Sequence, residues 1–367
     1  MKRKLFYRER NLFILLVGLA VICWYLASPQ ILAAEKEEEE DTVITISAAG
    51  DCTLGSDRSS PSSVNFYAVY NKKKNSGYFF KKVKTIFEKD DLTLVNFEGT
   101  LTKSSARAQK KFAFKGKPGY VNILKKGSIE AVAFANNHCR DYGQTSYRDT
   151  IACFKKADIV YSSYAKVGTY KVKGKKIGMI SVNGLENTSY VKQLIHKGMK
   201  KLKKKKADIC IVSMHAGIER NYSPGATQKS IARYAVKQGA NLVLGHHPHV
   251  LQGIEKFKGA YIVYSLGNFC FGGNTNPPDK DTMIFQQSFV FHNGKLSKSR
   301  STANVIPCLL SSKKGINNYQ PTVAKGKNKA RILKKIDGLC RPLGLTLKNK
   351  KGKYDGSLSA IHAGKKK

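Results

Sequence analysis

The feature that most constrains the fold of this chain is a series of short apolar runs that alternate with stretches of helical periodicity. Such alternation favours an α/β fold built on a central sheet. The runs are rich in β-branched residues and predict strands at residues 41–49, 92–97, 131–135, 176–182, 209–214, 242–244 and 261–266. The stretches between them predict helices, for example at residues 78–90, 118–127, 143–156, 188–205 and 225–238.

Most of the predicted strands end in a cluster of polar residues. Asp51 and Glu98 follow the first two strands, and five of the eight histidines follow three others, namely His138, His215, His246, His247 and His249. Ligands of α/β sheets bind at the carboxyl ends of strands, so we expect these side chains to converge in space. Carboxylates and imidazoles together are typical ligands of Zn, Mn or Fe. The sequence therefore predicts a site for one or two divalent metal ions.

The spacing within these clusters adds detail to the predicted ligand set. His247 and His249 flank Pro248, which stiffens the loop, so the two rings can bind one metal ion or bridge to a second. Asn137 can add an amide oxygen. His215 and Glu219 are four residues apart, which places them on one face if the segment is helical and means little if it is a loop.

The N-terminal residues predict that most of the chain is localised outside the cytoplasm. Residues 11–27 are apolar, and with residues 28–34 the segment is long enough to span a bilayer. The basic residues before it predict that the N-terminus stays inside and the rest of the chain lies outside. Residues 1–34 are therefore either a retained single-pass anchor, which we prefer, or a signal peptide that is cleaved on secretion. Residues 35–42 form an acidic spacer before the folded body.

The charge of the chain limits its partners. The 65 Lys+Arg against 25 Asp+Glu give a formal net charge of +40, and 53 of the basic residues are lysines. Lysine lacks the planar fork with which arginine reads phosphate and guanine, and no nucleic-acid-binding motif is present, so we do not expect a nucleic-acid partner. The excess of lysine either reflects a general compositional habit or forms a surface that binds polyanions such as teichoic acids, anionic lipids or an acidic capsule polymer.

The character of the sequence changes past residue 295. Residues 295–367 hold 16 Lys and 3 Arg against two Asp, and strand patterns are sparse. We therefore place the folded domain at residues 43–312 and interpret residues 313–367 as a Lys-rich C-terminal appendage, with one short helix near residues 328–338.

The cysteines do not form a disulfide framework. The chain has eight, none in a CxxC spacing, and an odd number of seven follows the apolar segment that contains Cys23. We expect buried free thiols.

Six segments together resemble the CapA family, the poly-γ-glutamate capsule biosynthesis proteins. The segments are AAGDCTLGSD (48–57), VNFEGTLT (95–102), FANNHCRDYG (134–143), HAGIER (215–220), GANLVLGHHPHVLQG (239–253) and YSLGNFCF (264–271). They occur in the order typical of the family. The resemblance implies a fold like that of calcineurin-like metallophosphatases, a β-sandwich flanked by helices, with a two-metal site.

Carried over by motif, the resemblance implies roles for individual residues. The metal ligands are Asp51, Glu98, Asn137, His215, His247 and His249, and His138 belongs to the same matching motifs. Our own hypothesis adds that His138 is a catalytic general acid and that Asp141, three residues on, orients it. We also predict substrate binding by Arg140, Glu219, Arg220, His246 and Asn268, with a surface ion pair as the alternative for each of the two arginines. Two departures stand out: Ala216 replaces a tryptophan common in relatives, and Thr53 stands where the metallophosphatase Asp-x-His motif has its histidine, so one metal would have fewer ligands.

Two functions follow from these observations. The first is a metal-dependent hydrolase or transferase that acts on a phosphoester or on an amide of an anionic polymer such as poly-γ-glutamate. The second is a non-catalytic, membrane-anchored factor that binds an acidic polymer in an export or assembly complex. Either function predicts an anionic envelope polymer and the membrane proteins of capsule synthesis or export as partners.

Overall fold

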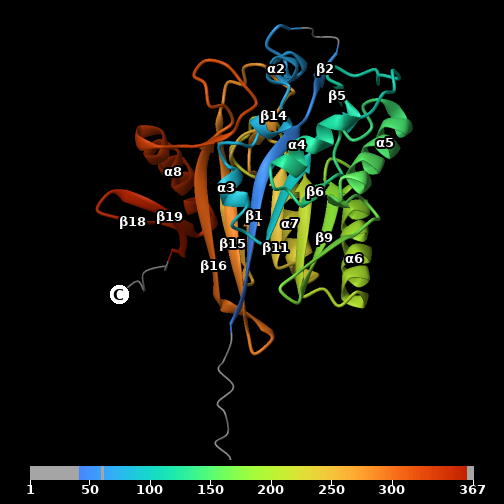
Figure 1. Cartoon of the computed structure of the whole chain (residues 1–367). Coiled ribbons are helices and arrows are strands. Elements are labelled where there is room, and N and C mark those ends of the chain that lie inside the picture. Colours follow the sequence, from blue (N-terminus) through green and yellow to red (C-terminus); the bar gives the residue numbers. More distant parts are fainter. Residues whose placement is uncertain (1–40, 59–61, 362–367) are drawn as a thin grey trace, which may run out of the picture. The chain divides into compact units, whose positions relative to one another are not determined.

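The computed structural model describes residues 41–58 and 62–361 (Figure 1). Residues 42–367 form one compact unit. The predicted anchor and most of the acidic spacer lie outside the described residues. Within the described ranges, no helix is long and apolar enough to cross a membrane.

The first of two large sheets mixes parallel and antiparallel strands. Its order is β18-β19-β16-β15-β1-β3-β6-β7, with β14 on β1 and β17 on β16. The parallel strands are β1 (Thr42–Thr53), β3 (Leu92–Phe97), β6 (Ala131–Ala133), β7 (Val160–Ser162) and β14 (Asn268–Phe271). The others pair antiparallel: β15 (Asp281–His292), β16 (Lys295–Leu309), β17 (Thr322–Val323), β18 (Leu345–Lys350) and β19 (Lys353–Ala360).

The second large sheet has the order β12-β13-β11-β10-β9-β8. Its strands are β8 (Gly168–Val172), β9 (Lys175–Asn183), β10 (Ile209–His215), β11 (Leu242–His246), β12 (Ile254–Phe257) and β13 (Ala260–Val263). A third, small sheet joins β2 (Ser56–Asp57), β5 (Phe114–Gly116) and β4 (Thr100–Leu101).

The two large sheets pack face to face. Successive side chains of a strand point to opposite faces, so each strand contributes to two cores. Leu92 and Leu94 of β3 share one core cluster with Ile209 and Ile211 of β10. The alternate residues pack the other way, so that Val95 lies in a second cluster and, on β10, Val212 lies in a third. The strand periodicity of two therefore produces a core between the sheets and one core outside each sheet.

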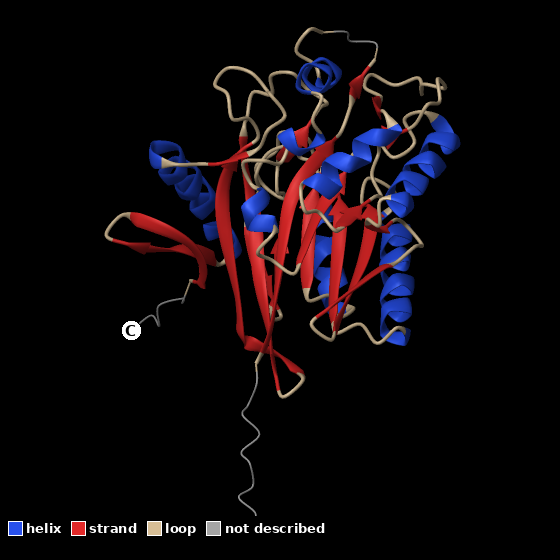
Figure 2. Ribbon diagram, viewed as in Figure 1, coloured by secondary structure: helices blue, strands red, loops and turns tan. Residues whose placement is uncertain are grey.

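Helices cover the two outer faces (Figures 1 and 2). The second cluster holds buried side chains of α2 (Phe66–Lys73), α3 (Lys84–Phe87), α4 (Val121–Lys126) and α5 (Gly143–Lys156). The third holds those of α6 (Thr188–Lys204) and α7 (Ala226–Lys237). The prediction of a mixed α/β fold with several helices is confirmed.

The predicted helix at residues 78–90 is much shorter in the structure. A 3₁₀ turn, η1 (Ser76–Tyr78), precedes α3, which spans only Lys84–Phe87. The apolar residues Phe79, Val83 and Phe87 are buried as their spacing predicts. The spacing of apolar residues indicates which side chains face the core. Consecutive turns can bury the same side chains as a continuous helix, so the spacing does not distinguish the two. A similar turn, η2 (Pro118–Tyr120), precedes α4.

The C-terminal residues are not a separate appendage in the structure. Helix α8 (Gly326–Cys340), the turn η3 (Arg341–Leu343) and the β18–β19 hairpin belong to the same compact unit as the sheets. Ile332, Leu333, Ile336, Leu345 and Leu347 join the core cluster between the sheets. The high lysine content of this segment obscured the apolar pattern of an amphipathic helix and two half-buried strands. The boundary predicted at residue 312 therefore does not divide two packed units.

The seven described cysteines are free, and six of them are buried. This agrees with the prediction of free thiols.

Candidate active site

Strand register brings the predicted polar clusters to one edge of the sheets. Asp51 on β1 pairs in register with Asn96 on β3 and with Asn268 on β14. His215 at the end of β10 pairs with His246 at the end of β11. The two sheets meet at this edge, where Nδ1 of His246 lies 3.5 Å from Oδ1 of Asp51.

Asp51 is the hub of the cluster and is fully buried. Its Oδ1 accepts a hydrogen bond from Nδ2 of Asn96 at 2.8 Å, and its Oδ2 lies 3.2 Å from Nδ1 of His249. Burial alone raises the pKa of Asp51, but the neighbouring imidazoles of His246 and His249 outweigh it and hold this pKa well below its usual range. Asp51 is therefore a carboxylate at neutral pH.

Glu98, the residue directly after β3, is buried without a hydrogen bond to either carboxylate oxygen. Its Oε1 lies 3.7 Å from Nε2 of His138 and 3.7 Å from Nε2 of His249. Burial is the main cause that raises the pKa of Glu98 well above its ordinary value. A buried carboxyl group that accepts no hydrogen bond is costly, so Glu98 is a candidate ligand for a cation.

The His247-Pro248-His249 loop holds both histidines in the left-handed backbone region, with φ of 96° at His247 and 57° at His249. Such conformations cost free energy in non-glycine residues and persist where the surroundings enforce them. The backbone N–H of His247 donates to Oδ2 of Asp51 at 3.3 Å, and Nδ1 of His249 lies 2.9 Å from Oδ1 of Asn268. The strained loop thus aims both rings at the strand ends.

Burial keeps two of the histidines neutral. It holds the pKa of His215 well below its ordinary value and lowers that of His247 to about 4. For His249 burial also acts to lower the pKa, but the charges of Glu98 and Asp51 raise it to about 9. Neutral imidazoles offer a free lone pair, which is the form that binds metal ions.

Several of these residues have ligand atoms close enough to share an ion. Ligand atoms of Asp51, Glu98 and His249 lie within 4.8 Å of one another, and so do those of Glu219, His247 and His249. His249 belongs to both groups. Among the described residues, the buried site atoms without a hydrogen-bond partner are Oε1 and Oε2 of Glu98, Oδ1 of Asn137, Nε2 of His215, Nδ1 and Nε2 of His246, and Nδ1 of His247. This donor set of oxygens and imidazole nitrogens fits a divalent transition metal.

His138 sits beside this cluster in a separate hydrogen-bond network. Its Nδ1 lies 2.7 Å from Oδ2 of Asp141, while Oδ1 of Asp141 accepts from Nζ of Lys110 at 2.7 Å. The imidazole stacks on Phe114 with ring centroids 4.3 Å apart. Burial is the main cause that lowers the pKa of His138. Asp141 thus fixes the ring and leaves Nε2 facing Glu98.

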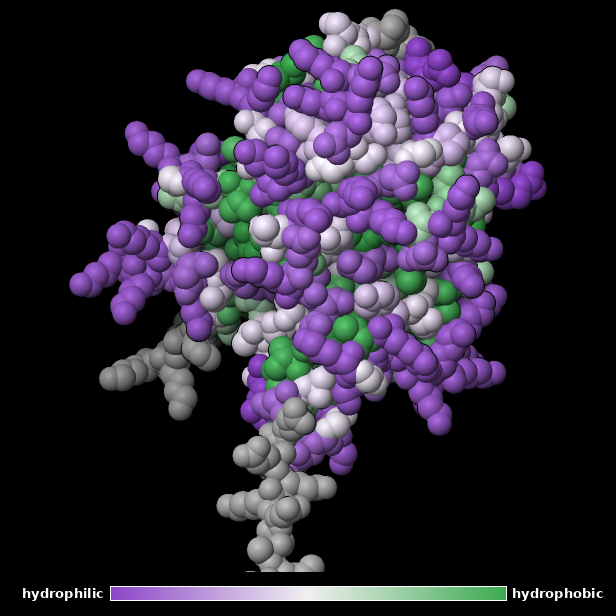
Figure 3. Space-filling view, in the orientation of Figure 1, coloured by the Kyte–Doolittle hydropathy of each residue, from purple (hydrophilic) through white to green (hydrophobic). Residues whose placement is uncertain are grey.

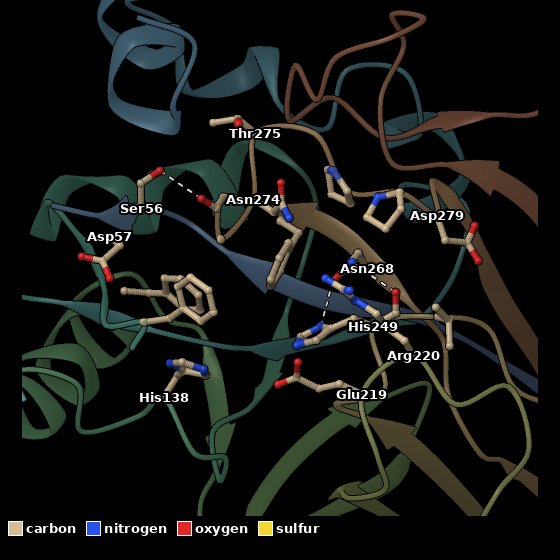
Figure 4. Close-up of a pocket in the computed structure, with 18 of the residues that line it drawn as sticks. Ser56, Asp57, His138, Glu219, Arg220, His249, Asn268, Asn274, Thr275 and Asp279 are labelled. Atoms are coloured by element: carbon tan, nitrogen blue, oxygen red, sulfur yellow. Dashed lines mark hydrogen bonds between the residues drawn. The ribbon is translucent and has the colours of Figure 1, made fainter. Parts of the chain in front are cut away.

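An open cavity of about 320 Å³ gives access to these residues. Figure 4 places His138 and Asp57 on one side of it and Glu219, Arg220 and His249 on the other. Asn268 lines it as well, as the sequence predicts for a substrate-binding residue. His246 lies deeper and is 2% exposed, so it adjoins Asp51 rather than the open space.

Arg140 does not join the site. Its guanidinium stacks over Tyr147 and Tyr164, at 4.4 and 4.9 Å from the ring centroids, and Nε donates to Gln144. Its sequence position beside His138 suggested a substrate contact. In the turn that follows His138, neighbouring side chains point in different directions.

Four further residues contribute to the site and were not predicted. Nδ2 of Asn136 donates to Oδ1 of Asn96, whose own amide holds Asp51 and lies 3.3 Å from Nδ1 of His215. Polar residues inside or directly after an apolar strand were the available signal for these two asparagines. Lys110 contacts His138 from a loop, and Phe114 contacts it from the small sheet. No sequence pattern predicts either contact.

Comparison with known proteins gives a consistent family. The family model described as "Bacterial capsule synthesis protein PGA_cap" matches residues 45–273. The chain is 31% identical to "PGA biosynthesis protein CapA" of Bacillus subtilis over 252 residues, which is 63% of this chain and 64% of that protein. It is 28% identical to "Capsule biosynthesis protein CapA" of Bacillus anthracis over 319 residues, 74% of each chain.

Two more distant similarities complete the comparison. A "Probable polyglutamine synthesis accessory protein" of Mycobacterium tuberculosis is 24% identical over 211 residues, 48% of this chain and 55% of that protein. A hypothetical protein of Thermus thermophilus with a crystal structure matches with a TM-score of 0.42 and 13% identity, over 72% of this chain and 99% of that one. This chain spans less than two thirds of the B. subtilis protein.

Proposed function

This chain belongs to the bacterial capsule synthesis protein PGA_cap family, and from that premise we propose that it is a metal-dependent hydrolase or transferase of an anionic envelope polymer. The polymer is of the poly-γ-glutamate type. The name of the B. subtilis relative, a PGA biosynthesis protein, supports this substrate class.

One observation carries the proposal. Buried carboxylate and imidazole atoms without hydrogen-bond partners converge at the ends of β3, β10 and β11, beside an open cavity. A binding cleft for a polymer does not need buried, unpartnered ligand atoms, because it can satisfy them with water or with each other. Metal binding does need them.

Asp51, Glu98, His215, His247 and His249 would hold the ion or ions, with Glu219 and Asn137 at the margin. A bound divalent ion supplies Lewis-acid chemistry, because it polarises the oxygen of a phosphoester or amide. Thr53, at the position of the missing motif histidine, has a buried hydroxyl without a partner. This weaker donor supports a site that holds one of two ions less tightly.

His138 handles the proton in this proposal. Because Nδ1 donates to Asp141, the other ring nitrogen, Nε2, is the atom that passes a proton to the leaving group. Stacking on Phe114 keeps the ring in place and excludes water from one of its faces. Arg220 and Asn268, which line the cavity, orient the anionic substrate.

The proposal also covers the fold family of the chain and its cellular localisation. The two packed sheets with helices outside support a metallophosphatase-like sandwich, as the family resemblance implies. Residues 1–34 would anchor the chain as a single-pass membrane protein with the body outside the cell. Membrane proteins of capsule synthesis or export would be its partners.

The alternative is a non-catalytic factor that binds a polyanion in an export or assembly complex. The net charge of +40 favours it, and hydrophilic residues cover most of the face in Figure 3. This function requires no metal.

Metal content separates the two functions. The unit of residues 42–367 would be purified beside a His247→Ala/His249→Ala variant and a His196→Ala control on α6. After loading with Mn or Zn, we expect one or two equivalents in the unit and the control, and at least a tenfold loss of affinity in the double variant with an unchanged circular dichroism spectrum. Turnover of an aryl phosphoester and a γ-glutamyl amide would follow. No metal in any of the three proteins would overturn the enzymatic function.

A further inference from the structure

A second groove, of about 660 Å³, lies on the other side of the small β2–β5–β4 sheet from the active-site cavity. Four basic residues line it, Arg58, Lys103, Lys115 and Lys117, and none of its lining residues is acidic. By contrast, Asp57, Glu219 and Asp279 line the active-site cavity beside a single arginine. The two hollows therefore differ in charge.

Strand alternation explains how one small sheet serves both hollows. On β5, Phe114 lines the active-site cavity and stacks on His138, whereas the next residue, Lys115, lines the groove. Directly after β2, whose Ser56 and Asp57 both line the cavity, Arg58 lines the groove. Successive side chains of a strand point to opposite faces, so β5 presents Phe114 to one space and Lys115 to the other. Asn65 lines both spaces, so they adjoin at that residue.

Within the described part of the chain, no acidic side chain forms an ion pair with the basic residues of the groove. Lys115 is 6% exposed, donates to the carbonyl oxygen of Ser104 at 2.5 Å and lies 4.5 Å from the ring centroid of Tyr142. No described carboxylate forms an ion pair with it. The nearby Asp57 is paired with Arg107 at 2.7 Å. A buried ammonium group without a counter-ion favours an anionic ligand.

We propose that this groove binds a carboxylate-bearing stretch of the anionic polymer whose reacting bond lies in the active-site cavity. The inference rests on the proposed function, since it adds a subsite to the same substrate. Lysine ammonium groups are point charges on flexible stems, so they suit carboxylates repeated along a chain better than one fixed bidentate anion. Because the two spaces adjoin at Asn65, one extended polymer would pass from one to the other there.

Binding of a fluorescein-labelled, γ-linked glutamate octamer tests the subsite. The full chain would be purified in detergent and measured at low salt with a chelator present, so that metal plays no part. Lys103→Gln/Lys117→Gln removes two exposed charges from the groove, and Lys200→Gln/Lys203→Gln removes two exposed charges from α6 as the matched control. We expect the groove variant to bind about three- to tenfold more weakly and the control to stay within about twofold of the wild type, as for two partly exposed ion pairs.

Two further probes sharpen the result. A γ-linked isoglutamine octamer, in which an amide replaces each side-group α-carboxylate, should bind the groove variant and the wild type equally. An oligothymidylate of the same charge should bind no more tightly than the glutamate octamer. Tighter binding of the oligothymidylate would overturn the proposal in favour of an unselective polyanion surface, and so would equal losses in the groove and control variants.

Failure of the subsite and failure of the proposed function are separable. If the groove variant binds the octamer like the wild type in a protein that holds metal, the subsite is overturned and the enzymatic function stands. If the protein holds no metal but the groove variant still loses octamer binding, the subsite stands and the enzymatic function is overturned.

Discussion

Glu98 and Asp337 are both buried carboxyl groups of the same folded unit, and their surroundings are opposite. Four donors surround Asp337: Thr346 Oγ1 at 2.6 Å and Leu347 N at 2.9 Å on Oδ1, and Arg341 Nε at 2.7 Å and Tyr354 Oη at 3.2 Å on Oδ2. Glu98 receives no hydrogen bond on either oxygen. The region around Asp337 connects α8 to the β18–β19 hairpin, whereas Glu98 lies in the candidate active site.

The difference shows what each carboxyl group is for. Although burial raises the pKa of Asp337, hydrogen bonds from Thr346, Leu347 and Arg341 hold it below its usual range, so the charged form stabilises the fold. At Glu98 burial raises the pKa with no hydrogen bond to offset it. We interpret a buried carboxyl group that costs stability and receives no hydrogen bond from the protein as a candidate for an external partner.

The largest effect is expected at Glu98. Glu98→Gln should lower metal affinity and turnover by more than about a hundredfold, because it removes a charged ligand atom whose effect exceeds that of groups which only orient ligands. The free energy of unfolding of the metal-free protein should be unchanged or raised by about 1 kcal/mol, since a neutral amide is less costly to bury than a charge. Calorimetric titration with Mn or Zn and urea unfolding with a chelator measure the two quantities.

Unchanged metal affinity in Glu98→Gln would remove Glu98 from the ligand set. A loss of stability comparable to the loss of affinity would show that Glu98 is a structural residue, as Asp337 is.

Asp337→Asn should act in the opposite way. It keeps the shape of the side chain but turns an amide N–H₂ toward donors and removes the charge that Arg341 pairs with. We expect the free energy of unfolding to fall by about 2–3 kcal/mol with metal content unchanged. The exposed Asp355→Asn on the same hairpin is the control, with an expected change within about 0.5 kcal/mol. Equal effects of the two variants in urea unfolding would contradict the structural role of Asp337.

The active site was more predictable from sequence than the region around Asp337. Strands β1, β3, β10 and β11 are buried on both faces and read as apolar runs, so their ends, and the polar residues there, are visible in the sequence. Parallel pairing then brings those ends together without further information. Asp51, Glu98, His215 and the His247–His249 loop follow from this rule alone.

The parts that sequence did not reveal are half-exposed or depend on long-range contacts. Most of β16, β18 and β19 and the second half of β15 alternate buried residues with half-buried or exposed ones, many of them Lys, Ser or Gln, so no long apolar run marks these strands. Lys110 reaches His138 and Asp141 across 28 and 31 residues of sequence. Such contacts depend on the path of a loop, and no periodicity encodes that path.

Asp141→Asn tests whether the region beside Glu98 contains positioning residues as well as ligands. Oδ2 of Asp141 lies 2.7 Å from Nδ1 of His138 and also accepts the backbone N–H of Phe114 at 2.5 Å. Loss of this carboxylate should lower kcat and kcat/KM equally, by about ten- to a hundredfold, while KM and metal content stay constant. Steady-state kinetics with the aryl phosphoester measure it. A raised KM with unchanged kcat would instead place Asp141 in substrate binding.

The smallest effect is a difference in the sign of two pH dependences, measured by urea unfolding of the metal-free proteins. Because the pKa of Asp337 is lowered by folding, its stabilisation is present above the ordinary Asp pKa of about 3.9 and is lost as the pH falls through the folded value. The stability gap between wild type and Asp337→Asn should therefore narrow in acid. Since the protein itself unfolds in strong acid, only about 1 kcal/mol of this decrease in the stability difference should be measurable.

Glu98 should show the opposite slope. Because its pKa is raised by folding, the wild type loses stability as the pH rises above the ordinary Glu pKa of about 4.3, so Glu98→Gln should gain on the wild type toward neutral pH. Slopes of the same sign in the two variants would show that both carboxyl groups serve the fold. Opposite slopes would separate a carboxyl group that stabilises the charged fold from one that the fold holds at a cost until a cation binds.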